Sequence, residues 1–384
     1  MKIGIDAHGV GGHSLGAGNE TYFKNLIGGL LEIDGRNEYH IFVNHPEAMS
    51  EVVRNRPNVR LISLWPHSQW LQRPFSAPLY AKRYGLDILH FPFVRPPLTA
   101  AKTIVTVHDA NFEVYPQDFT AIERWRMKLL VPPSCRKADL VFTVSEHARQ
   151  QIHEFYRVPL DRIVITFNAA DHLARKSQDQ PTPARNFDLQ AKYLLFVGTI
   201  QPKKNLARLA RAFDQFKSRT GFPHHLVLAG PWGWRNDEFE RTLASLIHRD
   251  QIHFPGWVNA REVEVLMRGA ELFVFPSLYE SFGIPPLEAQ RLGVPALVSD
   301  NTCFPEIYGD SVMYCNPESV DSIAGAIETM LRDPGLCADL VSRGARRVGM
   351  YSWRKCAEVA LAAYESLFHE RAERPSAVEE QYAR

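Results

Sequence analysis

The chain has 384 residues, of which 45% are hydrophobic and 23% are charged, a balance typical of globular proteins. This length is long for one domain and sufficient for two with separate cores. The formal net charge is only +1, which argues against a nucleic-acid-binding protein that uses a broad basic patch.

The cysteines and the hydropathy pattern indicate the compartment. Five cysteines include no Cys-x-x-Cys pair, so we expect free thiols in a reducing environment. No run approaches the roughly 18 apolar residues of a membrane-spanning helix, and the first residues predict a strand rather than a signal peptide. We therefore expect a cytoplasmic protein.

Short apolar runs alternate with amphipathic helical patterns along the first part of the chain. A helix capped by Asn19 is predicted after the first strand, with Tyr22 and Leu26 on its apolar face. Strands that alternate with helices indicate a parallel sheet with helices on both faces. The predicted strands are residues 2–6, 39–43, 59–64, 88–93, 103–107, 140–144 and 163–167.

The loop after the first strand is rich in glycine. Gly16 and Gly18 lie where a turn leads into a helix, so their backbone N–H groups are candidate phosphate contacts. The dinucleotide-binding pattern is incomplete, because Thr21 stands where a third Gly or Ala belongs and the second strand ends at Asn44 instead of an acid. This departure disfavours a dehydrogenase.

A polar, proline-bearing stretch at residues 173–191 is predicted to be a linker. A second α/β series follows it, with a helix at 206–217 and a late helix at 352–368. The predicted strands of this series are residues 193–197, 226–229, 252–254, 272–275 and 296–299.

The most informative stretch follows the strand at 272–275. Pro285 and Pro286 suit the first turn of a helix that ends near Gly293. Glu280 therefore lies in a loop at the carboxyl end of a strand, where open α/β sheets bind ligands and helix starts attract anions. Glu288, in the same helix, is a second carboxylate. Two acids beside a phosphate site make sense if one binds a sugar hydroxyl and the other a ribose.

The segment 275–290 resembles the Glu-x7-Glu signature of the family-four retaining glycosyltransferases, which include many mannosyl- and glucosyltransferases of surface-polysaccharide assembly. The resemblance covers nearly the whole chain. It implies the GT-B fold, an α/β architecture with two Rossmann-like domains facing across a cleft and a C-terminal helix crossing back to the N-terminal domain. The predicted parts are an acceptor domain (1–172), a linker (173–191), a nucleotide-sugar domain (192–350), the crossover helix (351–370) and a tail (371–384).

The same resemblance implies roles for several residues. Glu280 would bind the donor sugar and Glu288 the nucleotide ribose. The rest of the donor loop would be Ser281, Phe282 and Gly283.

The loop after the strand at 193–197 supplies the cations. Relatives often carry an Arg just after the glycine of this loop, but here Thr199 follows Gly198. The charge on a departing diphosphate is therefore left to Lys204, with Lys203 as a candidate helper. A solvated turn with two lysines is the alternative.

His108 follows the strand at 103–107, again at a carboxyl end. Its imidazole could hydrogen-bond the donor sugar, and similar enzymes place a His near the sugar C6 hydroxyl. A structural histidine of the core is the alternative reading.

The segment 121–137 combines cations with apolar side chains, including Arg124, Trp125, Arg126 and Lys128. Such a helix could rest on an anionic membrane near a lipid-linked acceptor. A solvated face of a core-packed helix is the alternative.

No Asp-x-Asp motif and no His/Cys cluster with zinc spacing occurs, so neither a metal nor a cofactor is expected. The sequence predicts a retaining hexosyltransferase that moves mannose or glucose from a UDP- or GDP-linked donor to a glycan or lipid-linked acceptor. A sugar-nucleotide epimerase of the same fold and a catalytically silent sugar-nucleotide-binding subunit stay open as alternatives.

Overall fold

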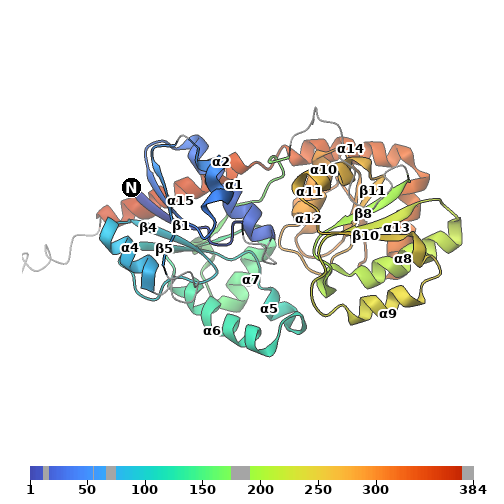
Figure 1. The fold of residues 1–384 in the computed structure, drawn as a ribbon, viewed down its shortest axis with the longest axis horizontal. Coiled ribbons are helices and arrows are strands. Elements are labelled where there is room, and N and C mark those ends of the chain that lie inside the picture. Colours follow the sequence, from blue (N-terminus) through green and yellow to red (C-terminus); the bar gives the residue numbers. More distant parts are fainter. Residues whose placement is uncertain (12–16, 55, 66–74, 174–190, 374–384) are drawn as a thin grey trace, which may run out of the picture. The chain divides into compact units, whose positions relative to one another are not determined.

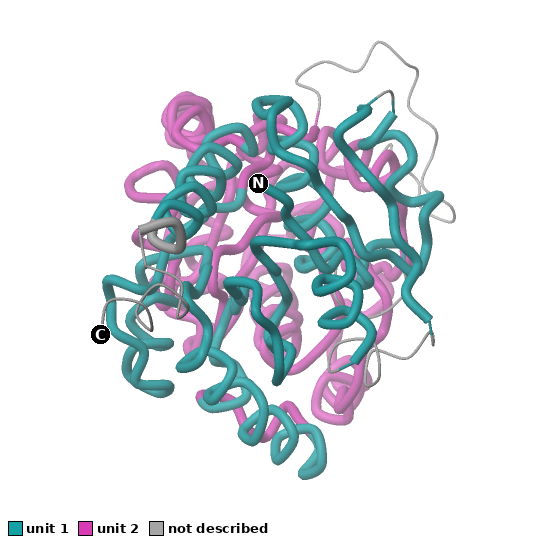
Figure 2. Tube along the Cα trace, turned by 90° about the vertical axis from the view of Figure 1, so that its left-hand side faces the viewer, with its two compact units in different colours: residues 1–113, 120–168, 353–384 teal, residues 114–119, 169–352 magenta. Residues whose placement is uncertain are grey.

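A computed structural model describes residues 1–11, 17–54, 56–65, 75–173 and 191–373 (Figure 1). The chain forms two compact units (Figure 2). Unit 1 comprises Met1–Glu113, Thr120–Asn168 and Trp353–Arg384, and unit 2 comprises Val114–Phe119 and Ala169–Ser352. Most of the predicted linker 173–191 and of the predicted tail 371–384 lies outside the described residues.

Unit 1 contains a seven-stranded sheet in the order β3-β2-β1-β4-β5-β6-β7, in which all neighbouring strands are parallel. The order reverses between β1 and β4, which is the kind of position where open sheets bind ligands. The strands are β1 (Lys2–Asp6), β2 (Glu38–Phe42), β3 (Val59–Ile62), β4 (Ile88–Pro92), β5 (Lys102–Thr106), β6 (Leu140–Thr143) and β7 (Ile163–Ile165).

The helices of unit 1 include the long C-terminal helix, which was predicted to return to the first domain. The helices are α1 (Ala17–Ile33), α2 (Ser50–Val53), α4 (Ala77–Tyr84), α5 (Asn111–Val114), α6 (Ala121–Lys137), α7 (Glu146–Tyr156) and α15 (Trp353–Glu373).

The prediction that Asn19 caps the first helix is wrong, because α1 already begins at Ala17 and Asn19 lies in its first turn.

Helix α15 packs along α1, and two contacts fix it to unit 1. The backbones approach so closely at Gly29 that an added Cβ would lie 2.7 Å from the carbonyl oxygen of Trp353 and 2.9 Å from Cβ of Ala357. Farther along α15, the hydroxyl of Tyr364 lies 2.7 Å from Nδ1 of His90 in β4. The crossing helix is therefore an integral part of unit 1.

Replacement of Gly29 by alanine should destabilise unit 1. Alanine favours a helix over glycine by about 1 kcal/mol, but here its methyl group overlaps backbone, and overpacking costs about 1–3 kcal/mol. Gly28→Ala is the matched control, because an added Cβ there meets only Val52, at 3.6 Å. Urea unfolding should show Gly29→Ala less stable than Gly28→Ala; equal stabilities would contradict the close approach.

Unit 2 contains a six-stranded parallel sheet in the order β10-β9-β8-β11-β12-β13. Its order reverses at β8 and β11. The edge strand β13 was not predicted. The strands are β8 (Tyr193–Val197), β9 (His225–Ala229), β10 (Ile252–Gly256), β11 (Leu272–Phe275), β12 (Ala296–Ser299) and β13 (Met313–Cys315).

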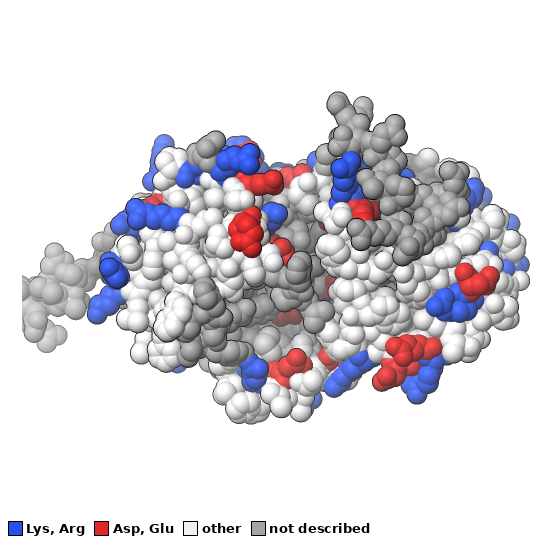
Figure 3. All heavy atoms as spheres, viewed as in Figure 1, with Lys and Arg blue, Asp and Glu red and all other residues white. Residues whose placement is uncertain are grey.

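The helices of unit 2 separate these strands in the chain, as the alternating pattern predicted. They are α8 (Leu206–Thr220), α9 (Asp237–Ser245), α10 (Ala260–Gly269), α11 (Ile284–Arg291), α12 (Phe304–Tyr308), α13 (Val320–Arg332) and α14 (Pro334–Val348). On the face drawn in Figure 3, Lys and Arg side chains are interspersed with Asp and Glu, without a broad patch of one sign.

Candidate active site

The loop between β11 and α11 has the backbone that the sequence predicted. Gly283 precedes α11 with φ +80°, and an added Cβ would lie 2.7 Å from Cε1 of Phe304. Only glycine suits this position, because it combines a left-handed conformation with close packing. The hydroxyl of Tyr308 donates to the carbonyl of Gly283 and holds the loop in place. The free N–H groups at the start of α11 are therefore held by a rigid support.

Lys204 and Glu280 are brought together across 76 positions of sequence. Nζ of Lys204 lies 2.5 Å from Oε1 of Glu280, and each side chain is 12% exposed. The ammonium also lies 4.7 Å from the centre of the Phe275 ring, a distance suited to a cation–π contact. A cation and a carboxylate thus stand together beside the start of α11.

Asn205 links the β8–α8 loop, which carries Lys204, to the β11–α11 loop, which carries Glu280. It adopts φ +63°, and its buried amide donates to the carbonyls of Pro276, at 3.0 Å, and Pro317, at 2.7 Å. The N–H of Leu278 donates to the carbonyl of Lys203 at 2.8 Å. Sequence reasoning passed over Asn205, although Asn is one of the few residues that tolerate a left-handed conformation.

Glu288 lies in α11, and its Oε1 is 3.0 Å from Nε2 of His172. Nearby, Arg291 donates to the carbonyl of Leu173 at 2.7 Å. His172 and Leu173, where the predicted linker begins, therefore contact the same helix that carries Glu288. His172 was not predicted as a site residue, because its contact with Glu288 spans 116 positions and leaves no local pattern.

The other predicted donor residues of unit 2 differ in what they can offer. Phe282 is buried and packs edge-on against Tyr351, so only its backbone is available to a ligand. Ser281 and Thr199 are half-buried. Lys203 does not join the Lys204–Glu280 pair but lines a separate cavity of unit 2.

His108 lies at the carboxyl end of β5 in unit 1. Its ring contacts Tyr22 edge-on, with centroids 4.8 Å apart, and its Nε2 is buried without a hydrogen-bond partner among the described residues. Burial lowers the pKa of His108 to about 4, so the imidazole is neutral near pH 7. It can take part in a hydrogen bond but cannot supply a positive charge.

The glycine-rich loop that leads into α1 was also predicted to contact the donor phosphate. Gly18 lies in the first turn of α1, whereas Gly16 lies outside the described residues. At the carboxyl end of β1, Nδ1 of His8 contacts the carboxylate of Asp6, and Nε2 of His8 is buried with no partner among the described residues. The carboxylate fixes the orientation of this imidazole.

The described residues lack two kinds of feature. They contain no group of three or more His, Cys, Asp and Glu side chains arranged to hold a metal ion. None of their helices is both long and apolar enough to cross a bilayer.

Comparisons with known proteins agree with this fold. Glycosyltransferase Family 4 matches residues 17–172, and Glycosyl transferases group 1 matches residues 177–347. O-antigen chain mannosyltransferase B of Escherichia coli is 30% identical over 283 residues, which are 73% of this chain and 74% of that protein.

Two solved structures show the same architecture. Sucrose-phosphate synthase from Thermosynechococcus elongatus aligns with a TM-score of 0.74 at 19% identity, over 96% of this chain and 99% of that one. HepE of Anabaena, solved in complex with UDP-glucose, aligns with a TM-score of 0.67 at 14% identity, over 95% of this chain and all of that one. With both halves matched by the same kind of enzyme, the chain belongs to the family-four glycosyltransferases and has the GT-B fold.

Proposed function

We propose that the protein transfers a hexose, mannose in preference to glucose, from a nucleotide diphosphate sugar to a glycan or lipid-linked glycan acceptor, with retention of configuration. The observation that carries the proposal is the Lys204–Glu280 pair beside the start of α11, which has Glu288 farther along the same helix. Mannose is favoured because the relative from Escherichia coli is a mannosyltransferase of O-antigen chains. Surface-polysaccharide synthesis is the corresponding process.

Each residue of the pair has a role in this proposal. Glu280 accepts hydrogen bonds from hydroxyls of the donor sugar and orients its anomeric carbon. Lys204 binds the diphosphate, together with backbone N–H groups of Ser281, Phe282 and Gly283. Glu288 binds the ribose hydroxyls.

Five further residues are proposed to complete the donor site. Thr199 and Lys203 would contact the donor from the β8–α8 loop, and Gly16 and Gly18 from the loop that leads into α1. The neutral His108 would hydrogen-bond the sugar.

The transfer needs no protein nucleophile. The bond from the anomeric carbon to the diphosphate oxygen breaks while a bond to the acceptor oxygen forms on the same face of the sugar. The acceptor proton passes to the departing phosphate oxygen, which leaves as the nucleotide diphosphate. Lys204 and the start of α11 stabilise the charge that grows on that phosphate, so their contribution is greatest in the transition state.

The proposed transfer should survive a chelator. Lys204 supplies the positive charge that a divalent ion supplies elsewhere, and the sequence contains no Asp-x-Asp. A thermal-shift screen with GDP-mannose, UDP-glucose and their free nucleotides identifies the donor, because a ligand of the folded state stabilises it. Transfer is then measured with and without EDTA, and activity lost to EDTA and restored by Mn²⁺ would contradict the prediction.

The same assay separates the alternatives. An epimerase would convert the donor in the absence of any acceptor, whereas a silent subunit would bind the donor and turn over nothing. Release of nucleotide that depends on a glycan acceptor distinguishes the proposed transferase from both.

Helix α6 supports a contact with the membrane surface near a lipid-linked acceptor. Ile122, Trp125 and Leu129 share one face of this helix, and all three are exposed, Trp125 by 65%. Arg124 and Lys128 are exposed on the same helix. An apolar face flanked by cations favours the surface of an anionic bilayer.

Charge reversal on helix α6 should abolish binding to anionic vesicles. In the triple variant Arg124→Glu, Arg126→Glu and Lys128→Glu, each lysine or arginine near a charged surface is expected to lose about 1 kcal/mol of attraction and gain repulsion. Sedimentation with phosphatidylglycerol vesicles measures the effect, and donor affinity measured by calorimetry is the control. Vesicle binding equal to that of the wild type would make α6 an ordinary solvated helix.

A further inference from the structure

Unit 2 holds a cavity of about 320 Å³, and among its lining residues Lys203 alone has been given a role in donor binding above. Its walls come from the short helical turn Pro116–Asp118, from the loop between β8 and α8, and from the start of α9. The size lies at the lower end of the range for small-ligand sites.

The cavity lies directly beside the proposed transfer centre. Lys203 and Leu278 both line it, and the N–H of Leu278 donates to the carbonyl of Lys203 at 2.8 Å. Lys203 is the neighbour of Lys204 in the chain, and Leu278 comes two residues before Glu280. The two loops that bring Lys204 and Glu280 together therefore also form this wall.

A buried carboxylate and an unpaired guanidinium line the cavity. Asp118 is 6% exposed, and its backbone carbonyl accepts a 2.7 Å hydrogen bond from the indole of Trp234. Burial raises the pKa of the Asp118 carboxyl, while the charges of Lys203 and Arg235 oppose that rise. Among the described residues Arg235 has no ion-pair partner within 4.0 Å. Its backbone lies in the left-handed region, at φ +56°.

This lining offers both donors and acceptors to the hydroxyls of a sugar, because its charged residues are of both signs: Lys203, Arg208, Arg235, Asp118 and Glu238. The buried Asp118 carboxylate accepts hydrogen bonds from hydroxyls, and the Arg235 guanidinium donates to them. Gln117 and Asn236 add amides, which do both, and the ring of Phe239 adds an apolar surface. Such a mixture of donors, acceptors and one aromatic face matches the polyhydroxylated ring of a hexose.

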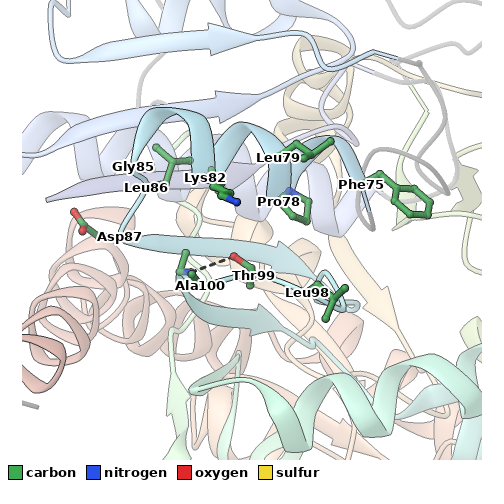
Figure 4. Close-up of a pocket in the computed structure, with 12 residues that line it drawn as sticks. Phe75, Pro78, Leu79, Lys82, Gly85, Leu86, Asp87, Leu98, Thr99 and Ala100 are labelled. Atoms are coloured by element: carbon green, nitrogen blue, oxygen red, sulfur yellow. Dashed lines mark hydrogen bonds between the residues drawn. The ribbon is translucent and has the colours of Figure 1, made fainter. Parts of the chain in front are cut away.

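The larger cavity of unit 1 has a more apolar lining. It has a volume of about 620 Å³ and lies between α4 and the segment around Leu98 (Figure 4). Phe75, Leu79 and Leu98 expose apolar side chains there. Its polar side chains are those of Lys82, Asp87 and Thr99, and none of its side chains is an amide or a guanidinium.

We propose that the cavity of unit 2 is an acceptor subsite, in which Asp118 and Arg235 bind a neutral hexose residue of the acceptor glycan next to the residue that receives the transferred sugar. This assignment rests on the proposed function, since it presupposes a glycan acceptor. It gives unit 2 a share in acceptor recognition in addition to its donor site.

Direct binding of α-linked mannotriose tests the subsite without requiring turnover. Saturation-transfer NMR measures its affinity for the wild type and for two variants, Asp118→Asn and Arg235→Asn. Asparagine keeps the shape of Asp118, and at position 235 it tolerates a left-handed conformation. Arg241→Asn is the matched control, because Arg241 is exposed in α9 and does not line the cavity.

Both cavity variants should bind mannotriose at least about tenfold more weakly, which is the effect of losing one charge-assisted hydrogen bond. Arg241→Asn should bind it like the wild type, and Asp118→Asn and Arg235→Asn should keep the wild-type affinity for the free nucleotide. The subsite is overturned if the wild type does not bind mannotriose at millimolar concentration, or if both cavity variants bind it as the wild type does. The proposed function fails separately, if the wild type neither binds nor cleaves any nucleotide sugar.

Discussion

Substitution of Lys204 by methionine should lower kcat by about 10²–10³. Methionine keeps the length of the side chain but removes the charge that stabilises the departing phosphate, and loss of one preorganised transition-state contact has an effect of this size. Steady-state kinetics with the donor identified by thermal shift measures it. Lys192→Met is the control, because Lys192 is a largely exposed lysine of the same unit that pairs only at its surface with Glu271.

The direct contact between Lys204 and Glu280 requires a second control. Lys204→Met leaves a largely buried carboxylate without its cation, which should cost about 1.5–3 kcal/mol of stability. The double variant Lys204→Met with Glu280→Gln should regain part of that stability, because the uncompensated charge is gone. If Lys204 acts on the phosphate, the double variant has a lower kcat than Glu280→Gln alone. If the two have the same kcat, the lysine serves only to hold Glu280.

Substitution of Glu280 and substitution of Glu288 should have different effects on nucleotide binding and on turnover. Glu288, as the proposed ribose ligand, contributes to every nucleotide-bound state, so Glu288→Gln should weaken both the free nucleotide and the nucleotide sugar. A lost charge-assisted hydrogen bond of about 1.5–3 kcal/mol corresponds to roughly ten- to a hundredfold in affinity. Glu280→Gln should leave the free nucleotide unaffected and depress kcat instead, because its contact orients the anomeric carbon.

Calorimetric titration of both variants with free nucleotide, alongside their kinetics, distinguishes these roles. His172→Gln is the control for Glu288, because it removes the 3.0 Å contact between His172 and Glu288 and keeps the carboxylate. If His172→Gln weakens nucleotide binding as much as Glu288→Gln, the carboxylate acts through His172. Loss of nucleotide affinity in Glu280→Gln with none in Glu288→Gln would reverse the assignment.

Local sequence signals were sufficient for the elements that carry the site. Pro285 and Pro286 lie in the first turn of α11, which begins at Ile284, and Gly293 follows its end with φ +79°. Apolar runs gave the strands of both sheets, apart from the three-residue β13. These signals work because caps, turns and buried strands depend on neighbours in the chain.

Contacts between distant residues could not be predicted in the same way. Lys203 and Lys204 are neighbours with the same chemistry, yet one lines a cavity and the other contacts Glu280. Their local sequence does not show which of them contacts Glu280, because that contact depends on the position of the β11–α11 loop. The position of Asp118 could not be predicted either. It lies far from the rest of unit 2 in the sequence, yet it lines the cavity of unit 2.

The membership of α15 in unit 1 also bears on how the protein is made. Unit 1 begins with β1, but the helix that packs against α1 at Gly29 starts only at Trp353. A ribosome must therefore translate all of unit 2 before it releases the last helix of unit 1. Since domains fold as units during synthesis, unit 2 can complete its core first, while the apolar face of α1 stays exposed until α15 has been synthesised. Unit 1, whose first strand is synthesised first, is thus the unit that completes its fold last.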